Sequence, residues 1–289
     1  MYPTEVPINE ENVAKLTSLM KRAYLEIVNE IKGATTFGAS NRSALLKQIE
    51  IILSDTGTHV ASFVEDELPY YYELGASDAT KQMKDIGLNV KTGTGFNRIH
   101  KEAIRALIDD TARSFGESLT GINRSANKLL SKAVRNEITE RMAIGKIGGK
   151  TLNSIKTNIV GLLEQDGLSA LIDKGGRAWE LDRYSEMLIR TKSVEARNRG
   201  MANRMVENGY DLVQVSNHSS EHAVCAYWEG KILSLTGHTK GYPTIAQAEA
   251  AGLFHPNCKH AINAYVQELA NLTQSYTPLV DVPPLDTTF

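Results

Sequence analysis

The sequence has few cysteines, few aromatic residues and no long hydrophobic run. Of its 289 residues, two are cysteines and 7% are aromatic. Two cysteines exclude a disulfide framework in a chain this long and favour a reducing compartment or a metal site. The N-terminus has neither the basic nor the apolar region of a signal peptide, and no run approaches the roughly 18 apolar residues of a membrane span. We therefore expect a soluble protein that is not exported and has no membrane contact.

Charge of either sign is not in excess. The 32 basic residues nearly balance the 34 acidic ones, which leaves a formal net charge of -2. The chain therefore has no overall basic field, and any contact with nucleic acid has to come from a local patch. With 42% hydrophobic and 23% charged residues, the composition is that of a folded globular protein.

Proline is absent between Pro69 and Pro243. A proline inside a helix removes a hydrogen bond, so its absence permits long helices, and apolar residues recur there at intervals of three and four. Helices are predicted over residues 9–33, 41–53 and 59–68, from Ser77, over 98–142 with breaks at Gly116 and Gly121, and from Thr151.

The character of the chain changes after Gly167. A turn or short hairpin is predicted at 173–179, helices at 182–208 (ended by Gly209) and 244–251, and strands at 211–216, 232–235 and 261–266. The predicted fold class is α+β, in which a mostly helical region (1–166) precedes a small α+β domain with a short sheet (167–275) and a proline-containing tail (276–289).

Histidine and cysteine are concentrated in one short segment. Five of the seven histidines and both cysteines lie between His218 and His260. Two close pairs, His222 with Cys225 and Cys258 with His260, can each present two ligands from one turn, as tetrahedral zinc sites require. We predict that these four residues form a zinc knuckle with a structural role, because four protein ligands leave no open position. His255 and His218 are left over as alternative ligands or as residues that support the ligands. Buried free thiols with scattered surface histidines are the alternative interpretation.

Basic residues gather on one predicted helix. Arg124, Lys128, Lys132 and Arg135 recur at helical spacing, so they share a face that is able to meet several phosphates of double-stranded DNA. No aromatic residue interrupts this face, which argues against stacking on single strands. A solvated helix face without a ligand is the other interpretation.

The C-terminal motifs resemble those of a known family. They are Gly-Gly-Arg-Ala-Trp at 175–179, Arg190-Thr191, Cys225-Ala-Tyr-Trp228-Glu-Gly230 and His255-Pro-Asn-Cys258-Lys-His260, with a weaker Tyr72-x-x-Gly75 upstream. In order and spacing, residues 175–265 resemble the phage minor capsid or Mu F-like head morphogenesis proteins. Other members carry Cys-x-x-Cys and His-Pro-x-Cys-x-Cys. In this chain, His222 and His260 replace the first and the last of those cysteines, and both replacements are zinc ligands.

The resemblance implies a structural protein of the head of a tailed bacteriophage. Such a protein binds the portal protein or the major capsid protein of the assembling procapsid, and it touches DNA during packaging or ejection. The implied location is the virion, and the host cytoplasm during assembly. The resemblance also implies that Trp179, Arg190, Thr191, Trp228 and Gly230 are structural motif residues.

No enzyme template fits the sequence well. A phosphate-binding GxxxxGK[ST] loop, a G-x-S-x-G elbow and an H-E-x-x-H helix are all absent, so no catalytic residue is assigned. Two enzyme alternatives stay open. Asn257 between His255 and His260 is compatible with a metal-dependent nuclease, and Arg190, Thr191 and Glu195 on one helix are compatible with an ADP-ribosyltransferase-like effector packaged in the head.

Overall fold

A computed structural model describes residues 2–34, 39–91, 96–144, 157, 161, 171–172, 178–179, 181–220 and 222–266. The chain forms two compact units, and each of them is built from separated stretches of sequence. The C-terminal unit contains the described residues of 1–9, 64–109 and 187–289, and the helical unit those of 10–63 and 110–186. Three long helices run from one unit into the other. The division at residue 166 that the sequence suggests stays a prediction.

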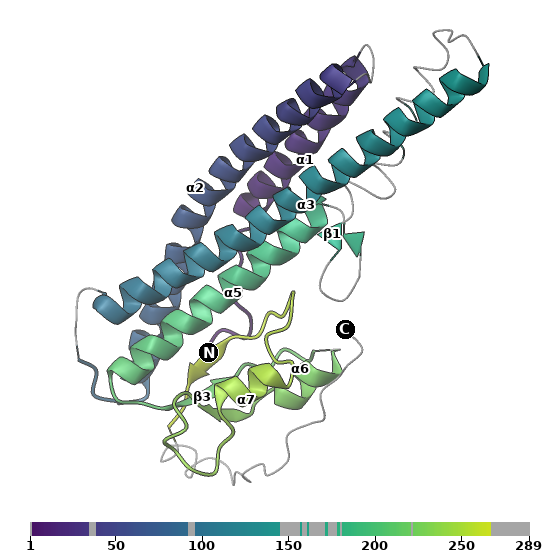
Figure 1. The fold of residues 1–289 in the computed structure, drawn as a ribbon. Coiled ribbons are helices and arrows are strands. Elements are labelled where there is room, and N and C mark those ends of the chain that lie inside the picture. Colours follow the sequence, from purple (N-terminus) through teal and green to yellow (C-terminus); the bar gives the residue numbers. More distant parts are fainter. Residues whose placement is uncertain are drawn as a thin grey trace. The chain divides into compact units, whose positions relative to one another are not determined.

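The helical unit begins with α1, Glu10–Gly33 (Figure 1). Its acidic first turn (Glu10, Glu11) and its basic last turn (Lys32) both complement the helix dipole. One stripe of the helix is buried, and it consists of Val13, Leu16, Met20, Ala23, Ile27, Val28 and Ile31. The helix predicted over 9–33 is therefore confirmed, and so is the apolar stripe that predicted it.

The second helix, α2, runs without interruption over Ala39–Asp85. The sequence predicts three helices here, and that prediction is wrong. Residues 54–58, between the first two predicted helices, stay helical because Ile52, Leu53 and Val60 on either side are buried. The Thr56 hydroxyl donates to the Ile52 carbonyl at 2.7 Å, so it has a partner within the helix. Pro69 and Ser77 are both inside the helix.

The third helix, α3, spans Arg98–Ile144 and is also continuous. The predicted breaks at Gly116 and Gly121 do not occur. Phe115, Leu119 and Ile122 are all buried around these glycines, so packing stabilises the helix despite its two weak helix formers. Of the helix predicted from Thr151, the structure describes residues 157 and 161, which are both helical. Among the described helices, none is long and apolar enough to cross a bilayer.

A small hairpin follows in the helical unit. Strand β1 (Leu171–Ile172) pairs antiparallel with β2 (Ala178–Trp179), with Leu171 opposite Trp179. This pairing confirms the short hairpin predicted at 173–179, whose turn residues are outside the described part of the chain.

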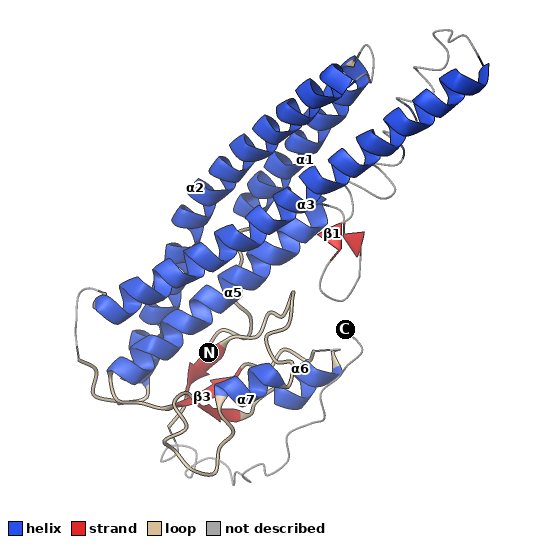
Figure 2. Ribbon diagram, in the orientation of Figure 1, coloured by secondary structure: helices blue, strands red, loops and turns tan. Residues whose placement is uncertain are grey.

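The C-terminal unit contains a three-stranded antiparallel sheet in the order β4-β3-β5 (Figure 2). Its elements are α5 (Leu181–Glu207, which starts in the helical unit), β3 (Leu212–Val215), α6 (Ala223–Trp228), β4 (Ile232–Ser234), α7 (Ile245–Ala250) and β5 (Ile262–Ala264). The α+β class is confirmed, and all three predicted strands are present. Helix α6 was not predicted, because its six residues are too few to show a helical period.

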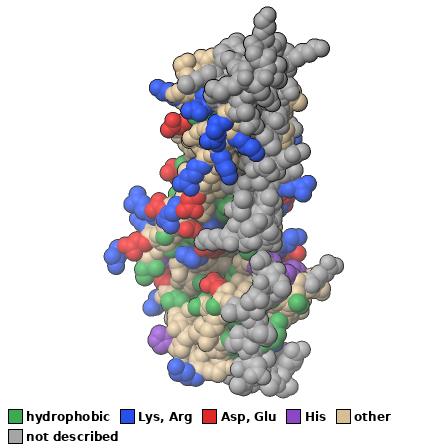
Figure 3. Space-filling model, turned by 45° about the vertical axis from the view of Figure 1, so that its right-hand side comes forward, with side chains coloured by type: hydrophobic (Ala, Val, Ile, Leu, Met, Phe, Trp, Pro, Cys, Tyr) green, Lys and Arg blue, Asp and Glu red, His purple; other side chains and the backbone are tan. Residues whose placement is uncertain are grey.

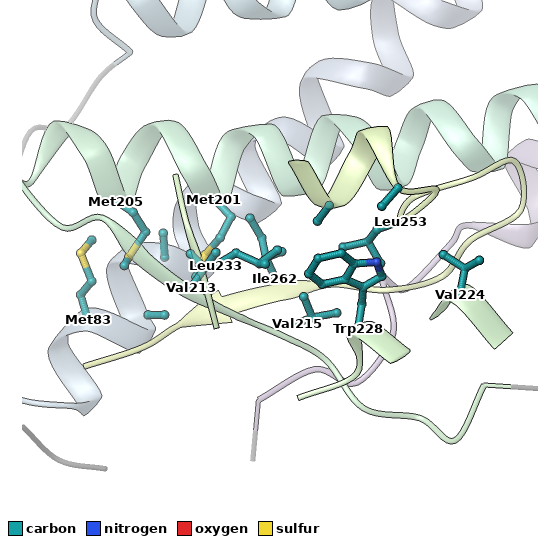
Figure 4. Packing of buried hydrophobic residues seen from close by; sticks show 14 residues of the cluster. Met83, Met201, Met205, Val213, Val215, Val224, Trp228, Leu233, Leu253 and Ile262 are labelled. Carbon is teal, nitrogen blue, oxygen red and sulfur yellow. The ribbon is translucent and has the colours of Figure 1, made fainter. Parts of the chain in front are cut away.

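The core of the C-terminal unit lies between the sheet and its helices (Figure 4). Val213 and Leu233 from the sheet pack with Met201 and Met205 from α5, and all four are fully buried. Trp228 closes the cluster from α6 and is 1% exposed. Burying an aromatic side chain of this size stabilises the packing of α6 against the sheet by about 2–3 kcal/mol.

Helices α2 and α5 cross at two glycines. A Cβ on Gly75 would lie 1.8 Å from the Arg197 carbonyl oxygen, and a Cβ on Gly200 would lie 2.0 Å from that of Tyr72. Real Cβ atoms do not approach so closely, so only glycine fits at either position. The two backbones are therefore in direct contact at this crossing.

Polar side chains from α2 and α5 hold strand β5 at the same crossing. The Arg197 guanidinium is fully buried, and it donates to Asp78 Oδ2 at 2.8 Å and to the Ile262 carbonyl at 2.6 Å. Asn198 accepts from the Ile262 backbone N–H at 3.1 Å, and Gln82 accepts from that of Ala264 at 2.8 Å. The strand that leads away from the histidine and cysteine pairs is thus fixed to two long helices.

Candidate metal centre

Two loops carry the histidines and cysteines, and the sheet brings them to one end of the unit. The first loop follows β3 and leads through His222 into α6, and the second leads from α7 through Cys258 into β5. Because β3 and β5 are antiparallel neighbours with Val215 opposite Ile262, the end of one strand meets the start of the other. The bond from the Ser216 N–H to the Ala261 carbonyl, 2.8 Å, continues this pairing into the loops.

Backbone strain is concentrated in these two loops. Among the described residues, the non-glycine residues with positive φ are Ser219 (60°), Phe254 (62°) and Asn257 (65°), and all three flank the histidines and cysteines. Such conformations cost on the order of 1 kcal/mol or more each and cluster at functional sites. Helix α5 stabilises one of them, since the Asn257 N–H donates to Thr191 Oγ1 at 3.1 Å.

Five side chains converge between the loops, and we call them the His/Cys cluster: His222, Cys225, His255, Cys258 and His260. Cys225 Sγ lies 3.8 Å from Cys258 Sγ and 3.0 Å from His255 Nε2, and Cys258 Sγ lies 3.2 Å from His260 Nδ1. Ligand atoms within 4.8 Å of one another form two groups that share Cys225, one with His222 and His255 and the other with Cys258 and His260.

Electrostatics shift the pKa values of the two thiols in opposite directions. The hydrogen bond from Cys225 lowers the pKa of Cys258, and bonds from His260 lower it further against the opposing effect of burial. The pKa of Cys225 is raised, because this thiol is the donor of that bond and because burial disfavours its thiolate. A metal ion would take the place of the shared proton, since it binds the deprotonated forms of both groups.

A layer of ionisable side chains, Glu229, His218 and Glu5, lies beside His260. Its Nε2 lies 3.2 Å from Glu229 Oε1, and the His218 ring stacks on the His260 ring with centroids 4.1 Å apart. Burial disfavours the charged form of His260, but its bonds to Cys258 and Glu229 outweigh this and raise its pKa. Glu5 reaches the same layer from the N-terminal segment, where its Oε1 lies 3.8 Å from His218 Nδ1.

The donor set fits zinc better than a harder metal. Thiolate and imidazole groups select zinc or another borderline-soft metal, whereas magnesium and calcium require oxygen ligands. Two sulfurs bound to one tetrahedral zinc at about 2.3 Å lie about 3.8 Å apart. The Cys225–Cys258 separation of 3.8 Å matches this value.

A groove runs along α5 beside the cluster. Its volume is about 510 Å³, and His255 and Cys258 form part of its wall together with Thr191, Glu195 and Phe254. The cluster is therefore accessible from one side, although both cysteines are buried.

The residues of the resemblance occupy separate places in the fold. Trp228 is in the core, Gly230 takes φ of 72° and donates its N–H to the Val215 carbonyl at 3.1 Å, and Thr191 holds the strained Asn257. Arg190 is half-buried on α5. Trp179 belongs to β2 in the helical unit, whereas the His/Cys cluster belongs to the C-terminal unit.

The basic residues predicted to meet DNA are exposed on α3. This holds for Arg124, Lys128, Lys132 and Arg135, all of which belong to the helical unit. On the face of the molecule that Figure 3 shows, basic and acidic side chains are interspersed, in keeping with the balanced composition.

Two sets of residues escaped the sequence analysis. Arg197 and Asn198 anchor β5, and a signal for them existed, because they lie on the same stripe of α5 as the buried Val194 and Met201. A charged residue on an apolar stripe points to a buried polar contact. The other is Glu229, whose contact with His260 depends on how two loops meet, and no local sequence signal predicts that. His218, which the sequence left as an alternative or supporting ligand, lies beside His260.

Comparisons with known proteins identify the family of this chain. The family model described as phage minor capsid protein 2 matches residues 15–281, which is most of the chain and far more than the third that the sequence motifs suggested. A protein of Lactococcus phage LL-H named "Structural protein" is 28% identical over 107 residues, which cover 34% of this chain and 29% of that protein. No solved structure matches the chain. The match of the family model over both the long helices and the His/Cys cluster shows that this chain belongs to the phage minor capsid protein 2 family.

Proposed function

We propose that this protein is a structural component of the head of a tailed bacteriophage, where it binds the portal protein or the major capsid protein during assembly. The observation that carries the proposal is the family match over residues 15–281. The phage relative that is named a structural protein supports it. The protein would then be found in the virion, and in the host cytoplasm while heads assemble.

The proposal includes a structural zinc ion in the His/Cys cluster. Cys225, Cys258 and His260 would bind it, and the fourth ligand would be His222, as the sequence predicts, or His255. The short Cys225 Sγ to His255 Nε2 distance of 3.0 Å favours His255. Zinc would cross-link two loops whose backbone is strained, and this chain's own residues would position it through the β3–β5 pairing.

The exposed basic face of α3 would contact double-stranded DNA. Its four residues are spaced so that each can meet a backbone phosphate, which gives affinity without sequence preference. DNA packaged in the head is the corresponding ligand.

An enzyme is the second candidate, because the groove opens onto His255 and Cys258. A metal-dependent nuclease would use this opening to admit a phosphate. The bond between the Asn257 N–H and Thr191 Oγ1 gives both of these residues a structural role instead, and family membership favours the structural protein. Incubation of the purified protein with plasmid and Mg²⁺, and with labelled NAD and host lysate, separates the candidates: turnover that His255→Ala or Arg190→Ala abolishes would favour an enzyme.

The head assignment is tested on purified particles. Mass spectrometry of heads separated from lysate should find this protein together with the portal, and affinity purification of the portal from infected cells should recover it. Recovery with the portal but not with an unrelated virion protein, such as a tail fibre, is the expected result. A protein that is found only in the soluble lysate would refute the assignment.

A further inference from the structure

We propose that Glu229 is the positioning residue of the metal centre, which fixes His260 so that its Nδ1 faces the metal. This inference rests on the metal site proposed above and assigns a role to a residue outside the predicted ligand set. The contacts of the two ring nitrogens of His260 carry it. Nδ1 lies 3.2 Å from Cys258 Sγ, on the side of the cluster, whereas Nε2 lies 3.2 Å from Glu229 Oε1, on the opposite side of the ring.

These contacts select one tautomer of His260. Glu229 Oε1 accepts from the backbone N–H groups of Ser220 and His218, so this oxygen is the acceptor in its bond with His260 as well. Nε2 therefore carries the proton. Nδ1 then keeps its lone pair for the metal. Histidines that bind metals commonly donate their other N–H to a carboxylate in this way, which orients the ring and makes it a stronger ligand.

Glu229 is itself immobilised by the other loop. Its Oε1 accepts from the Ser220 N–H at 2.9 Å and from the His218 N–H at 3.1 Å, and its side chain is only 9% exposed. One carboxylate oxygen therefore joins the loop that leads to Cys225 with the histidine that follows Cys258. Glu229 therefore aligns the loops that carry the two ligand pairs before a metal binds. The two loops then need less further ordering when the metal binds.

The same layer could instead be a second metal site, since ligand atoms of His218, Glu229 and His260 lie within 4.8 Å of one another. The bonding argues against this. Glu229 Oε1 already accepts two backbone N–H bonds, and a second metal would have to bind His260 through the nitrogen that donates to Glu229. The proposal therefore predicts one metal ion per chain.

The test compares zinc binding by the full chain and two variants. Zinc affinity is measured by competition with a chromophoric chelator in wild type, Glu229→Gln and Glu229→Ala, with Glu249→Gln, an exposed carboxylate of α7, as the matched control. Glu229→Gln keeps an oxygen acceptor for the two backbone N–H groups and should fold normally. We expect zinc to bind about 10–100-fold more weakly to Glu229→Ala, less weakly to Glu229→Gln, and unchanged to Glu249→Gln.

A spectroscopic readout separates positioning from general stability. In ¹⁵N-histidine NMR spectra of the zinc-loaded wild type, His260 should show a protonated Nε2 and a metal-bound Nδ1, and Glu229→Gln should change these signals while apoprotein stability in urea changes little. Wild-type affinity in both Glu229 variants, or a metal-bound Nε2, would overturn the proposal. A second zinc that Glu229→Ala abolishes would also overturn it. Wild type that binds no zinc would instead refute the metal site itself.

Discussion

The contact between α2 and α5 gives the sharpest prediction about stability. In Gly75→Ala, the new Cβ would lie 1.8 Å from the Arg197 carbonyl oxygen, where even the tightest real contacts are near 3.0 Å. The helices would have to separate by more than an ångström. Arg197 is at the same crossing, so the separation would also stretch its 2.8 Å bond to Asp78 and uncover a fully buried guanidinium.

The expected loss is large. Overpacking alone costs about 1–3 kcal/mol, and breaking a buried ion pair costs about 3–5 kcal/mol. We therefore expect Gly75→Ala to lower the free energy of unfolding by about 3 kcal/mol or more, which is a factor of at least about 100 in the unfolding equilibrium. Gly200→Ala should act similarly, because its Cβ would lie 2.0 Å from the Tyr72 carbonyl oxygen. The double variant should lose less than the sum of the two single losses, since both clash at one contact.

Urea unfolding followed by circular dichroism measures these losses, and the chain provides a matched control. Gly116 is inside α3 with nothing within 4 Å of its added Cβ, so Gly116→Ala should stabilise the protein by about 0.5–1 kcal/mol through its better helix propensity. Replacement of glycine by alanine is thus expected to lower the free energy of unfolding at Gly75 and to raise it at Gly116. A Gly75→Ala midpoint at or above the wild-type value would refute the reasoning.

Three other results are expected. Cys258→Ser should lose bound zinc and raise amide exchange in β5 but not in α1, as measured by mass spectrometry; unchanged exchange in β5 would contradict a structural metal. Replacement of Lys128 and Lys132 by glutamine should make the slope of log affinity for duplex DNA against log salt shallower by about 2, and an unchanged slope would argue against phosphate contacts. Burial raises the pKa of Asp211, but bonds from Ser234, Thr236 and Thr239 outweigh it and leave the pKa lowered. The stability that this carboxylate contributes is therefore present above its unfolded pKa of about 3.9 and is lost as pH falls below that value. Asp211→Asn lacks this contribution, so its melting temperature should depend less on pH below about 4 than the melting temperature of wild type does.

The sequence predicted correctly those helices and strands whose pattern is visible within a few consecutive residues. The stripe of α1, the strands β3 to β5 and the short helix α7 are all readable over a few residues, and all are confirmed. The breaks predicted in α2 and α3 are wrong because weak helix formers do not end a helix when tertiary packing holds both sides of them. Pro69 is an example, since it lies inside α2 with the buried Leu68 and Tyr71 beside it.

The candidate metal centre, too, could be predicted only as far as the spacing of neighbouring residues indicates it. The spacing of His222 with Cys225 and of Cys258 with His260 indicated two ligand pairs, and the structure places both pairs at the sheet end. Their partners could not be predicted, because the approach of His255 to Cys225 and of Glu229 to His260 depends on loops joined by strand pairing across 30 residues or more. The two glycines of the helix crossing were visible in the sequence, but their reciprocal contact follows from the fold.

The bonds that hold β5 also determine how this sheet can meet other proteins. The outward-facing N–H and carbonyl of Ile262 bond to Asn198 and Arg197, and the N–H of Ala264 bonds to Gln82. Amide and guanidinium side chains therefore occupy positions where another strand would pair. A partner that tried to extend the sheet at β5 would have to displace three side chains of two helices. Recognition by strand addition is therefore blocked at this edge, and any protein that binds here has to contact side-chain surfaces instead.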